Sequence, residues 1–273
     1  AGEMPGAGFS AGLQAAGPVA GIDYIPHGVH FTFRSPASKG SPGMAAWRFP
    51  ARLQSFRMAR GSQGCGTAMT ERIEVRAVGP QPRVISHIVA VLVRGGLIAY
   101  PTDSGYALGW RADNRKARDR VVRLRQLEEG HLFTYCCRTI SDVSRYAKVS
   151  NWAHRLIRQL APGPYTFVLP ATGEVPRTQR HKKLATIGIR IPKHDVVQAI
   201  LHSIDEPLLS SSLIVPGMED EIFDTEDLYD AVHRDVDLFV DAGHCPLEPT
   251  TLLDLTGEAP RVLRLGQGVV DFL

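Results

Sequence analysis

The sequence predicts a three-layer α/β fold, in which helices cover both faces of a β-sheet. Along residues 69–273, segments with the strand period of two alternate with segments that have the helix period. This interleaving favours one α/β domain over separate all-α and all-β modules. With 44% hydrophobic and 22% charged residues, the chain has the composition of a globular protein with a sizeable core.

The elements are expected in a regular order. Residues 70–76 alternate apolar and polar side chains, which predicts a first strand. Residues 83–94 place five aliphatic side chains on one helical face, and Gly95 and Gly96 predict the end of that helix. Further helices are expected at residues 116–127, 151–160, 196–203 and 226–233. Further strands are expected at residues 97–100, 132–137, 165–169, 186–191, 207–213, 238–240, 251–255 and 261–264.

Residues 1–68 differ in kind from the rest of the chain. They hold 12 of the 26 glycines and six of the 19 prolines, without a sustained helix or strand period. Such a composition cannot bury enough apolar surface to offset the entropy of ordering, so we expect a low-complexity, disordered segment. A related hypothesis is that Met69 is the natural start, that residues 1–68 are translated upstream sequence, and that the domain spans residues 69–273.

Charge and short motifs exclude several classes of protein. Residues 1–68 carry a net charge of +4 and the remainder −1, so the overall +3 gives no indication of a nucleic-acid partner. No apolar run approaches the roughly 20 residues of a membrane-spanning helix, and no secretory signal pattern is present. The GxxxxGK[ST] and GxGxxG nucleotide motifs are absent, and the histidine spacing predicts no metal site.

The four cysteines are Cys65, Cys136, Cys137 and Cys245, and none of them forms a CxxC pair. Cys136 and Cys137 end the apolar run Phe-Thr-Tyr-Cys-Cys. Buried reduced thiols are therefore favoured over disulfides or a zinc site, and we expect a cytoplasmic protein.

The stretch YPTDSGYALGW, residues 100–110, follows an apolar strand and brings Thr102, Asp103, Ser104 and Tyr106 into a small space. One interpretation is a polar turn, and the other is a ligand-binding loop. Other expected strands also carry polar side chains. These strands help to decide between a polar turn and a ligand-binding loop.

In TIGIRIP, the period of two places three isoleucines on one face and Thr186, Gly188 and Arg190 on the other. Gly188 leaves a gap beside the guanidinium, which suits close approach of a ligand. The alternative is a solvent-facing arginine on an edge strand.

Three more segments show hydroxyl or basic groups on an expected strand. In LLSSSL, Ser210 and Ser212 share a face, unless they are small core positions. Thr250 lies in PTTLLDL, and Arg264 ends the strand in VLRLGQG. Two further guanidiniums, Arg123 and Arg125, diverge on a continuous helix and converge only if the helix breaks near them. Arginines beside hydroxyls suit a phosphate or carboxylate ligand.

Together, these segments resemble those of the threonylcarbamoyl-adenylate synthase superfamily. The motifs GGLIAYPTDSGYALG, RLRQL, APGPYTFVLP, TIGIRIP, PLLSSSL and PTTLLDLTGEAPRVLRLGQG occur in that family's order. The resemblance covers residues 83–273 and is closest to the YciO branch, a sister of the YrdC proteins. It implies a YrdC-like fold, a twisted mixed sheet flanked by helices with a positively charged concave cavity.

The resemblance also implies an activity. Active members of the family join L-threonine, bicarbonate and ATP to give threonylcarbamoyl-AMP and pyrophosphate. The product later modifies the adenosine beside the anticodon of some tRNAs to N6-threonylcarbamoyladenosine. We therefore expect a nucleotidyltransferase with ATP as substrate, Mg²⁺ accompanying the triphosphate and no covalent nucleophile.

By comparison with the family, two groups of side chains are expected in the cavity. The threonine substrate is expected to contact Thr102, Ser104, Arg190, Ser210 and Thr250. ATP is expected to contact Arg123, Arg125, Thr186, Ser212 and Arg264.

Five positions depart from the pattern of the family's synthases. Arg123 and Gln126 replace the lysine and proline of Lys-x-Arg-Pro. Leu213 and Ile214 replace the alanine and asparagine of Ser-x-Ser-Ala-Asn, and Thr134 stands in place of a histidine. Arginine differs from lysine in reach and geometry, and isoleucine removes an amide donor and acceptor. These differences agree with the YciO branch and predict a related ligand or slow turnover.

A second function stays open, that of a non-catalytic protein that binds double-stranded RNA or tRNA through the same cavity, as described for YrdC relatives. The near-neutral charge of residues 69–273 argues against strong non-specific RNA binding. The basic run of Arg177, Arg180, Lys182 and Lys183 is either an RNA contact or a solvated loop.

Overall fold

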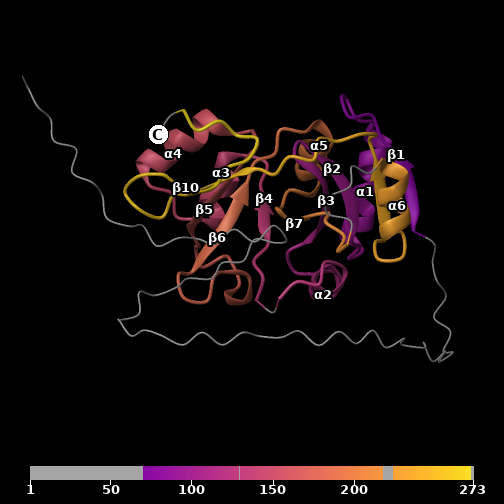
Figure 1. The fold of residues 1–273 in the computed structure, drawn as a ribbon, viewed down its shortest axis with the longest axis horizontal. Coiled ribbons are helices and arrows are strands. Elements are labelled where there is room, and N and C mark those ends of the chain that lie inside the picture. The colour runs from indigo at the N-terminus through magenta and orange to yellow at the C-terminus, as the bar shows by residue number, and fades with distance from the viewer. Residues whose placement is uncertain (1–69, 129, 218–223, 272–273) are drawn as a thin grey trace, which may run out of the picture. The chain divides into compact units, whose positions relative to one another are not determined.

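The computed structural model describes residues 70–128, 130–217 and 224–271, which form one β-sheet with helices on both faces (Figure 1). The three-layer α/β fold predicted from the sequence is therefore confirmed. The expectations for residues 1–68 and for Met69 lie outside the described residues.

The helices and strands follow the alternating order that the sequence predicts. The strands are β1 (Glu71–Glu74), β2 (Ile98–Thr102), β3 (Gly105–Arg111), β4 (Thr134–Cys136), β5 (Tyr165–Pro170), β6 (Thr186–Arg190), β7 (Leu208–Ser212), β8 (Leu238–Asp241), β9 (Thr251–Asp254) and β10 (Arg261–Arg264). The helices are α1 (Pro82–Val93), α2 (Arg115–Leu124), α3 (Ile140–Tyr146), α4 (Asn151–Leu160), the 3-10 turn η1 (Arg177–Gln179), α5 (Asp195–Ile204) and α6 (Thr225–Val232).

The sheet is mixed, with the strand order β1-β8-β2-β3-β7-β4-β6-β5-β9-β10. The pairs β1–β8, β8–β2, β4–β6 and β5–β9 are parallel, and the other neighbours are antiparallel. Figure 1 places β1 and β10 at opposite ends of this sheet. Strands that are distant in sequence therefore become neighbours in its centre, where β7 lies between β3 and β4.

Three elements of the structure were not expected from the sequence: strand β3, helix α3 and the turn η1. Strand β3 pairs with β2 in a hairpin, and it shows no polar alternation because its residues are buried on both faces up to Trp110. Helix α3 is only seven residues long, and its local signal is the capping box between Thr139 and Asp142. Helix α2 ends at Leu124, earlier than expected, and Gln126 follows with a left-handed φ of 49°.

Each face of the sheet carries its own hydrophobic core. Helices α2, α3, α4 and α6 cover one face, and their buried side chains include Ala117, Val121, Val143, Ala153, Ile157, Leu228 and Val232. Helices α1 and α5 cover part of the other face, where Ile88, Leu92, Val197 and Ile200 pack against Ile98, Leu208 and Leu238. Burial of each large aliphatic side chain contributes about 1.5–3 kcal/mol, so both helical layers are held mainly by these contacts.

Side-chain caps define where several of the helices begin. The side chain of Asn114 accepts a hydrogen bond from the amide of Ala117, and Ser150 accepts one from Ala153. Both residues immediately precede the first residue of their helix. Each side chain thereby satisfies an amide that lacks a partner within the helix. Among the described residues, no helix combines the length and apolar character needed to cross a bilayer.

Candidate functional site

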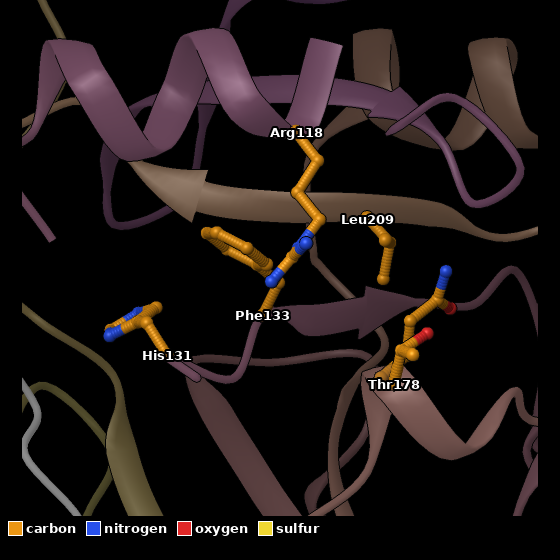
Figure 2. Close-up of a pocket in the computed structure, with 6 residues that line it drawn as sticks. Arg118, His131, Phe133, Thr178 and Leu209 are labelled. Atoms are coloured by element: carbon orange, nitrogen blue, oxygen red, sulfur yellow. The ribbon is translucent and has the colours of Figure 1, made fainter. Parts of the chain in front are cut away.

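A pocket lies on the α2 side of the sheet, between α2, the first residues of β7 and the turn η1 (Figure 2). Its lining residues are Arg118, His131, Phe133, Thr178, Gln179 and Leu209. None of these belongs to the set predicted from the sequence. The predicted residues on β6 and β7 lie on the other side of the sheet, as the alternation of these strands shows.

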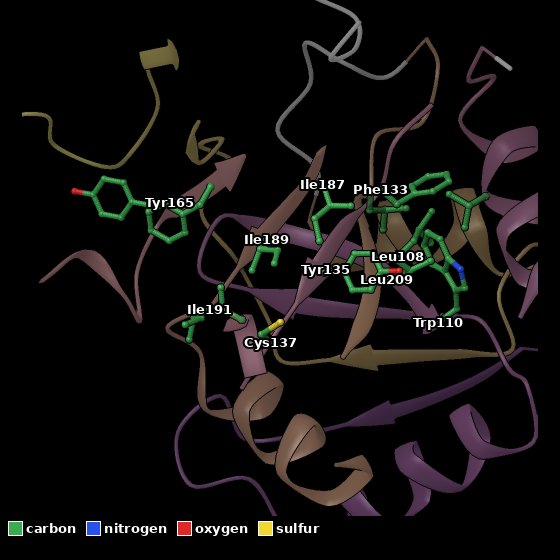
Figure 3. Close-up of a cluster of buried hydrophobic side chains, with 14 of the residues drawn as sticks. Leu108, Trp110, Phe133, Tyr135, Cys137, Tyr165, Ile187, Ile189, Ile191 and Leu209 are labelled. Carbon is green, nitrogen blue, oxygen red and sulfur yellow. The ribbon is translucent and has the colours of Figure 1, made fainter. Parts of the chain in front are cut away.

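Strand β6 divides its side chains between the two faces. The core cluster beneath α3 and α4 takes in its isoleucines, Ile187, Ile189 and Ile191 (Figure 3). The alternate residues Thr186, Gly188 and Arg190 therefore face the opposite side, as the sequence predicts. Leu209 of β7 belongs to the same core cluster, so Ser210 and Ser212 share the side of Arg190.

We call this side of β7, β4, β6 and β5 the polar face. Among the described residues, the core cluster beneath α1 and α5 includes none from β5, β6, β9 or β10. The apolar cover of these two helices therefore reaches β7 and β4, through Leu208 and Cys136, but does not extend to β6 and β5. The strand register brings its hydroxyls side by side, since Thr134 of β4 stands opposite Gly188 on one side and Ser210 on the other.

Gly188 creates space in the middle of the polar face. A Cβ atom at this position would lie 3.6 Å from Oγ1 of Thr134 and 3.7 Å from Cγ2 of Thr166. The glycine thus separates two threonines by a gap that a side chain would otherwise fill. A ligand group that approaches the backbone here meets the hydroxyl of Thr134 on one side and the methyl group of Thr166 on the other.

Arg190 connects the polar face to the tip of the β2–β3 hairpin. Its Nη1 donates a hydrogen bond to Oγ of Ser104 at 2.8 Å, and its Nη2 forms an ion pair with the carboxylate of Asp103. The backbone amide of Lys193 donates to the second oxygen of Asp103 at 3.1 Å. The Nε atom of Arg190 is buried and has no hydrogen-bond partner among the described residues. The guanidinium is therefore held in place while its Nε donor stays available.

Thr102 shapes the hairpin turn. Its Oγ1 accepts a hydrogen bond from the amide of Ser104 at 3.1 Å and donates one to the carbonyl of Gly105 at 2.6 Å. These local bonds use the hydroxyl within the turn, and the side chain is buried. Of the two predicted hydroxyls in this loop, Ser104 is the one that contacts Arg190.

Thr250 immediately precedes β9, next to the polar face. Its Oγ1 is 2.9 Å from Oγ1 of Thr166. Arg264, at the end of β10, donates to the carbonyl of Thr250 at 2.9 Å and contacts its hydroxyl at 3.3 Å. The structure thus brings the predicted pair Thr250 and Arg264 together, with Thr166 as an additional neighbour.

The remaining positions on β6 and β7 differ in exposure. Thr186 is buried at the start of β6, two residues before Gly188 on the same face. Ser212 is exposed at the end of β7. Ile214, which replaces the family's asparagine, is 39% exposed close to this strand end.

The two helix-end arginines do not meet Ser210 and Ser212. Arg123 is exposed at the end of α2. Arg125 donates a hydrogen bond through Nη1 to the hydroxyl of Ser211, which alternates with its neighbours and faces the α2 side. Burial lowers the pKa of Arg125 to about 10, and its Nε has no partner among the described residues. Arg125 would therefore have to pass around the end of β7 to reach a ligand on the polar face.

Two residues of this site were absent from the set predicted from the sequence. Asp103 holds Arg190, but local sequence carries no information on which cation a carboxylate meets. Thr166 had a usable signal, because the alternation in PYTFVLP places it opposite the core residues Tyr165 and Phe167. The resulting arrangement of a fixed guanidinium and several hydroxyls can bind and orient an anionic, oxygen-rich ligand.

Comparison with known proteins shows which family the chain belongs to. The family model for the Sua5, YciO and YrdC proteins, described as "Telomere recombination", matches residues 90–266. Over 202 residues the chain is 43% identical to the "uncharacterized protein YciO" of Escherichia coli K12, which covers 74% of this chain and 98% of that protein. The crystal structure of E. coli YciO matches with a TM-score of 0.70 over the same shares of the two chains.

More distant relatives carry the name of an activity. A threonylcarbamoyl-AMP synthase of Hydrogenovibrio crunogenus is 30% identical over 133 residues, which is 46% of this chain and 70% of that protein. P. abyssi Sua5 in complex with L-threonine shares the fold with a TM-score of 0.65 at 24% identity, over 72% of this chain and 58% of that one. By sequence and by fold, the chain belongs to the Sua5/YciO/YrdC family, and within it to the YciO branch.

Proposed function

We propose that the protein is a nucleotidyltransferase of the threonylcarbamoyl-AMP synthase type. It would join L-threonine, bicarbonate and ATP into threonylcarbamoyl-AMP and pyrophosphate, or act on a close variant of these substrates. The observation that carries this proposal is the buried Nε of Arg190, which lies near Ser104 and the polar face and has no hydrogen-bond partner within the described part of the chain. A buried guanidinium donor requires an acceptor, and the carboxylate of an amino acid supplies one.

The threonine end of the ligand is assigned to Ser104, Arg190, Ser210 and Thr250, with Thr102 shaping the loop. This assignment rests on the family resemblance and on the contacts of Arg190. The hydroxyls would hold the amino acid beside the guanidinium. The rate would come from holding the carbamate in line with the α-phosphate, which converts a bimolecular encounter into a positioned one.

The nucleotide end is assigned to Thr186, Ser212 and Arg264. Arg123 and Arg125 would join the phosphates only if the Arg125 side chain leaves Ser211 and passes around the end of β7. No protein nucleophile is needed, because the carbamate oxygen attacks the α-phosphate and pyrophosphate leaves. The cations would stabilise the charge that develops on the phosphate oxygens. Among the described residues, no group of three or more His, Cys, Asp or Glu side chains is placed to hold a metal ion. Mg²⁺ would therefore be bound mainly by the triphosphate.

The expected compartment is part of the same proposal. Cys136, Cys137 and Cys245 are buried with free thiols. Reduced cysteines are the usual state in the cytosol. In the cytosol, the product would serve the modification of tRNA adenosine.

The proposal is tested by pyrophosphate release from the purified protein with ATP, L-threonine and bicarbonate. We expect release that requires all three, and a drop in kcat/KM for threonine of about 10- to 150-fold in Arg190→Gln. Arg72→Gln serves as the matched control, because Arg72 is also held by a carboxylate, that of Asp241, but lies on the edge strand β1. Absence of both pyrophosphate release and threonine binding in the unmutated protein would refute the proposal.

The second candidate function is RNA binding. The segment around η1 supports it, because Arg177, Lys182 and Lys183 are exposed and Arg180 is half-buried. The affinity for a short RNA duplex can be measured by fluorescence anisotropy at several salt concentrations. If these cations contact phosphates, the affinity should fall steeply as the salt concentration rises. Lys182→Ala with Lys183→Ala should then reduce that slope.

A further inference from the structure

Tyr100 lies beneath the polar face and contacts one of its hydroxyls. Its phenol oxygen is 2.8 Å from Oγ of Ser210 and 3.8 Å from Sγ of Cys136. The ring is fully buried and lies against Gly109 of β3, where a Cβ atom would come within 2.6 Å of its Cε1. The absence of a side chain at Gly109 thus permits the ring to reach across β3 to Ser210 on β7.

The direction of these hydrogen bonds follows from the chemistry of the three groups. Burial raises the pKa of Tyr100 well above its usual value, so the phenol keeps its single proton. A thiol is a weak donor and a weak acceptor, whereas a serine oxygen accepts well. Tyr100 therefore donates to Ser210, and Cys136 is the weaker contact on its other side. The proton of Ser210 then points away from Tyr100, where the thiol of Cys136 is the protein group in contact with it and a ligand oxygen, as the better acceptor, would take its place.

We propose that Tyr100 is a positioning residue that presents the Ser210 hydroxyl as a hydrogen-bond donor to an anionic oxygen of the substrate. This inference rests on the proposed function, and it adds the chemical class of the group beside Ser210. A carboxylate or carbamate oxygen fits a site with a hydroxyl donor and the guanidinium of Arg190. An ammonium group does not, because it brings only donors.

The first test is the affinity for L-threonine and for ATP, measured by calorimetry in Tyr100→Phe. The variant keeps the ring and removes only the hydroxyl, so we expect an increase of about 3- to 10-fold in the Kd for threonine. The Kd for ATP should change less than twofold. Tyr135→Phe is the matched control, because Tyr135 is also buried but its hydroxyl donates to Gln179 on the other side of the sheet. Its Kd for threonine should remain that of the unmutated protein.

The second test asks whether Tyr100 acts through Ser210. In a double-mutant cycle, Tyr100→Phe should have no further effect on threonine affinity once Ser210→Ala is present. Gly109→Ala gives an independent check, since the added methyl group displaces the ring while keeping its hydroxyl. It should weaken threonine binding in the same range as Tyr100→Phe.

The outcomes separate this inference from the proposed function. If the unmutated protein binds L-threonine but Tyr100→Phe and Tyr135→Phe behave alike, the positioning role is wrong and the proposed function stands. Additive losses in the double variant, or equal losses for threonine and ATP, would likewise assign Tyr100 a purely structural role. If the unmutated protein does not bind L-threonine, the proposed function and this inference both fail.

Discussion

Asp103 and Arg190 form an ion pair that joins the tip of the β2–β3 hairpin to the last residue of β6. Both side chains are mostly buried, with exposed fractions of 14% and 10%. The pair closes the polar face at one end and aims the guanidinium of Arg190 at Ser104. Because two distant segments are held by this contact, its removal should affect stability as well as ligand binding.

Breaking the ion pair on one side should cost more than removing both partners. Arg190→Gln leaves the Asp103 carboxylate buried without its charge partner, which we expect to lower the free energy of unfolding by about 3–5 kcal/mol. The double variant Asp103→Asn with Arg190→Gln should lose less than the sum of the single variants. Urea unfolding of all four proteins measures this difference. Additive losses would mean that the two groups are not coupled.

Gly188→Ala should separate binding from stability. The new methyl group would make ordinary contacts of 3.6 and 3.7 Å with Thr134 and Thr166, so the free energy of unfolding should change by less than about 1 kcal/mol. It fills the gap on the polar face, however, and should weaken threonine binding about tenfold or more. Gly173→Ala is the control, because a Cβ there meets no atom within 4 Å. Unchanged binding in Gly188→Ala would place the ligand elsewhere.

Arg125→Met should stabilise the ligand-free protein and weaken ATP binding. Burial lowers the pKa of Arg125 to about 10, and its hydrogen-bond partner is the neutral hydroxyl of Ser211. Removing this desolvated charge should raise the free energy of unfolding by about 1–2 kcal/mol at pH 7. If the guanidinium pairs with phosphates, ATP affinity should fall about 10- to 150-fold while threonine affinity holds. Calorimetry with each ligand distinguishes this from equal losses, which would assign Arg125 to the fold.

The pH dependence of Arg125 has a defined sign. Its pKa in the folded protein lies below the usual 12.5, so the unfolded chain binds more protons between about pH 10 and 12.5. The free energy of unfolding contributed by this group should therefore rise with pH in that window. Arg115→Met, at an exposed position of α2, provides the control for the loss of an arginine.

Cys245 should resist alkylation at neutral pH. Burial raises the pKa of its thiol to about 11, and the thiolate is the reactive form. Peptide mass spectrometry after iodoacetamide treatment should show little label on Cys245 at pH 8 and more as the pH approaches 11. The stability that this thiol contributes is complete below about pH 9 and is lost between pH 9 and 11. Rapid labelling at pH 8 without denaturant would show that the site opens readily.

Ile214→Asn should raise the rate of pyrophosphate release. The amide restores a donor and an acceptor near the end of β7, where the family's synthases carry asparagine. Ile214 is 39% exposed, so its replacement should cost little stability. Leu213 is buried in the core and should be left in place. Val78→Asn, at a position that is 81% exposed, is the matched control, and equal rates in both variants would remove Ile214 from the nucleotide site.

Local sequence determined most of the elements and the assignment of faces within them. The alternation in TIGIRIP correctly placed the isoleucines in the core and Thr186, Gly188 and Arg190 on the other side, because side-chain direction in a strand depends only on residue parity. The same rule placed Ser210 and Ser212 together. Strand β3 escaped this reasoning because both of its faces are buried, so its apolar pattern lacks alternation.

The contacts between segments were decided only by the tertiary structure. Tyr100 reaches Ser210 because β7 inserts between β3 and β4, and Arg190 meets Asp103 because the hairpin tip reaches the end of β6. Arg125 lies on the α2 side because its partner is Ser211 and not a neighbouring serine. Strand order and the path of a loop depend on how whole elements pack, and the periodicity of a single segment carries no record of its neighbours.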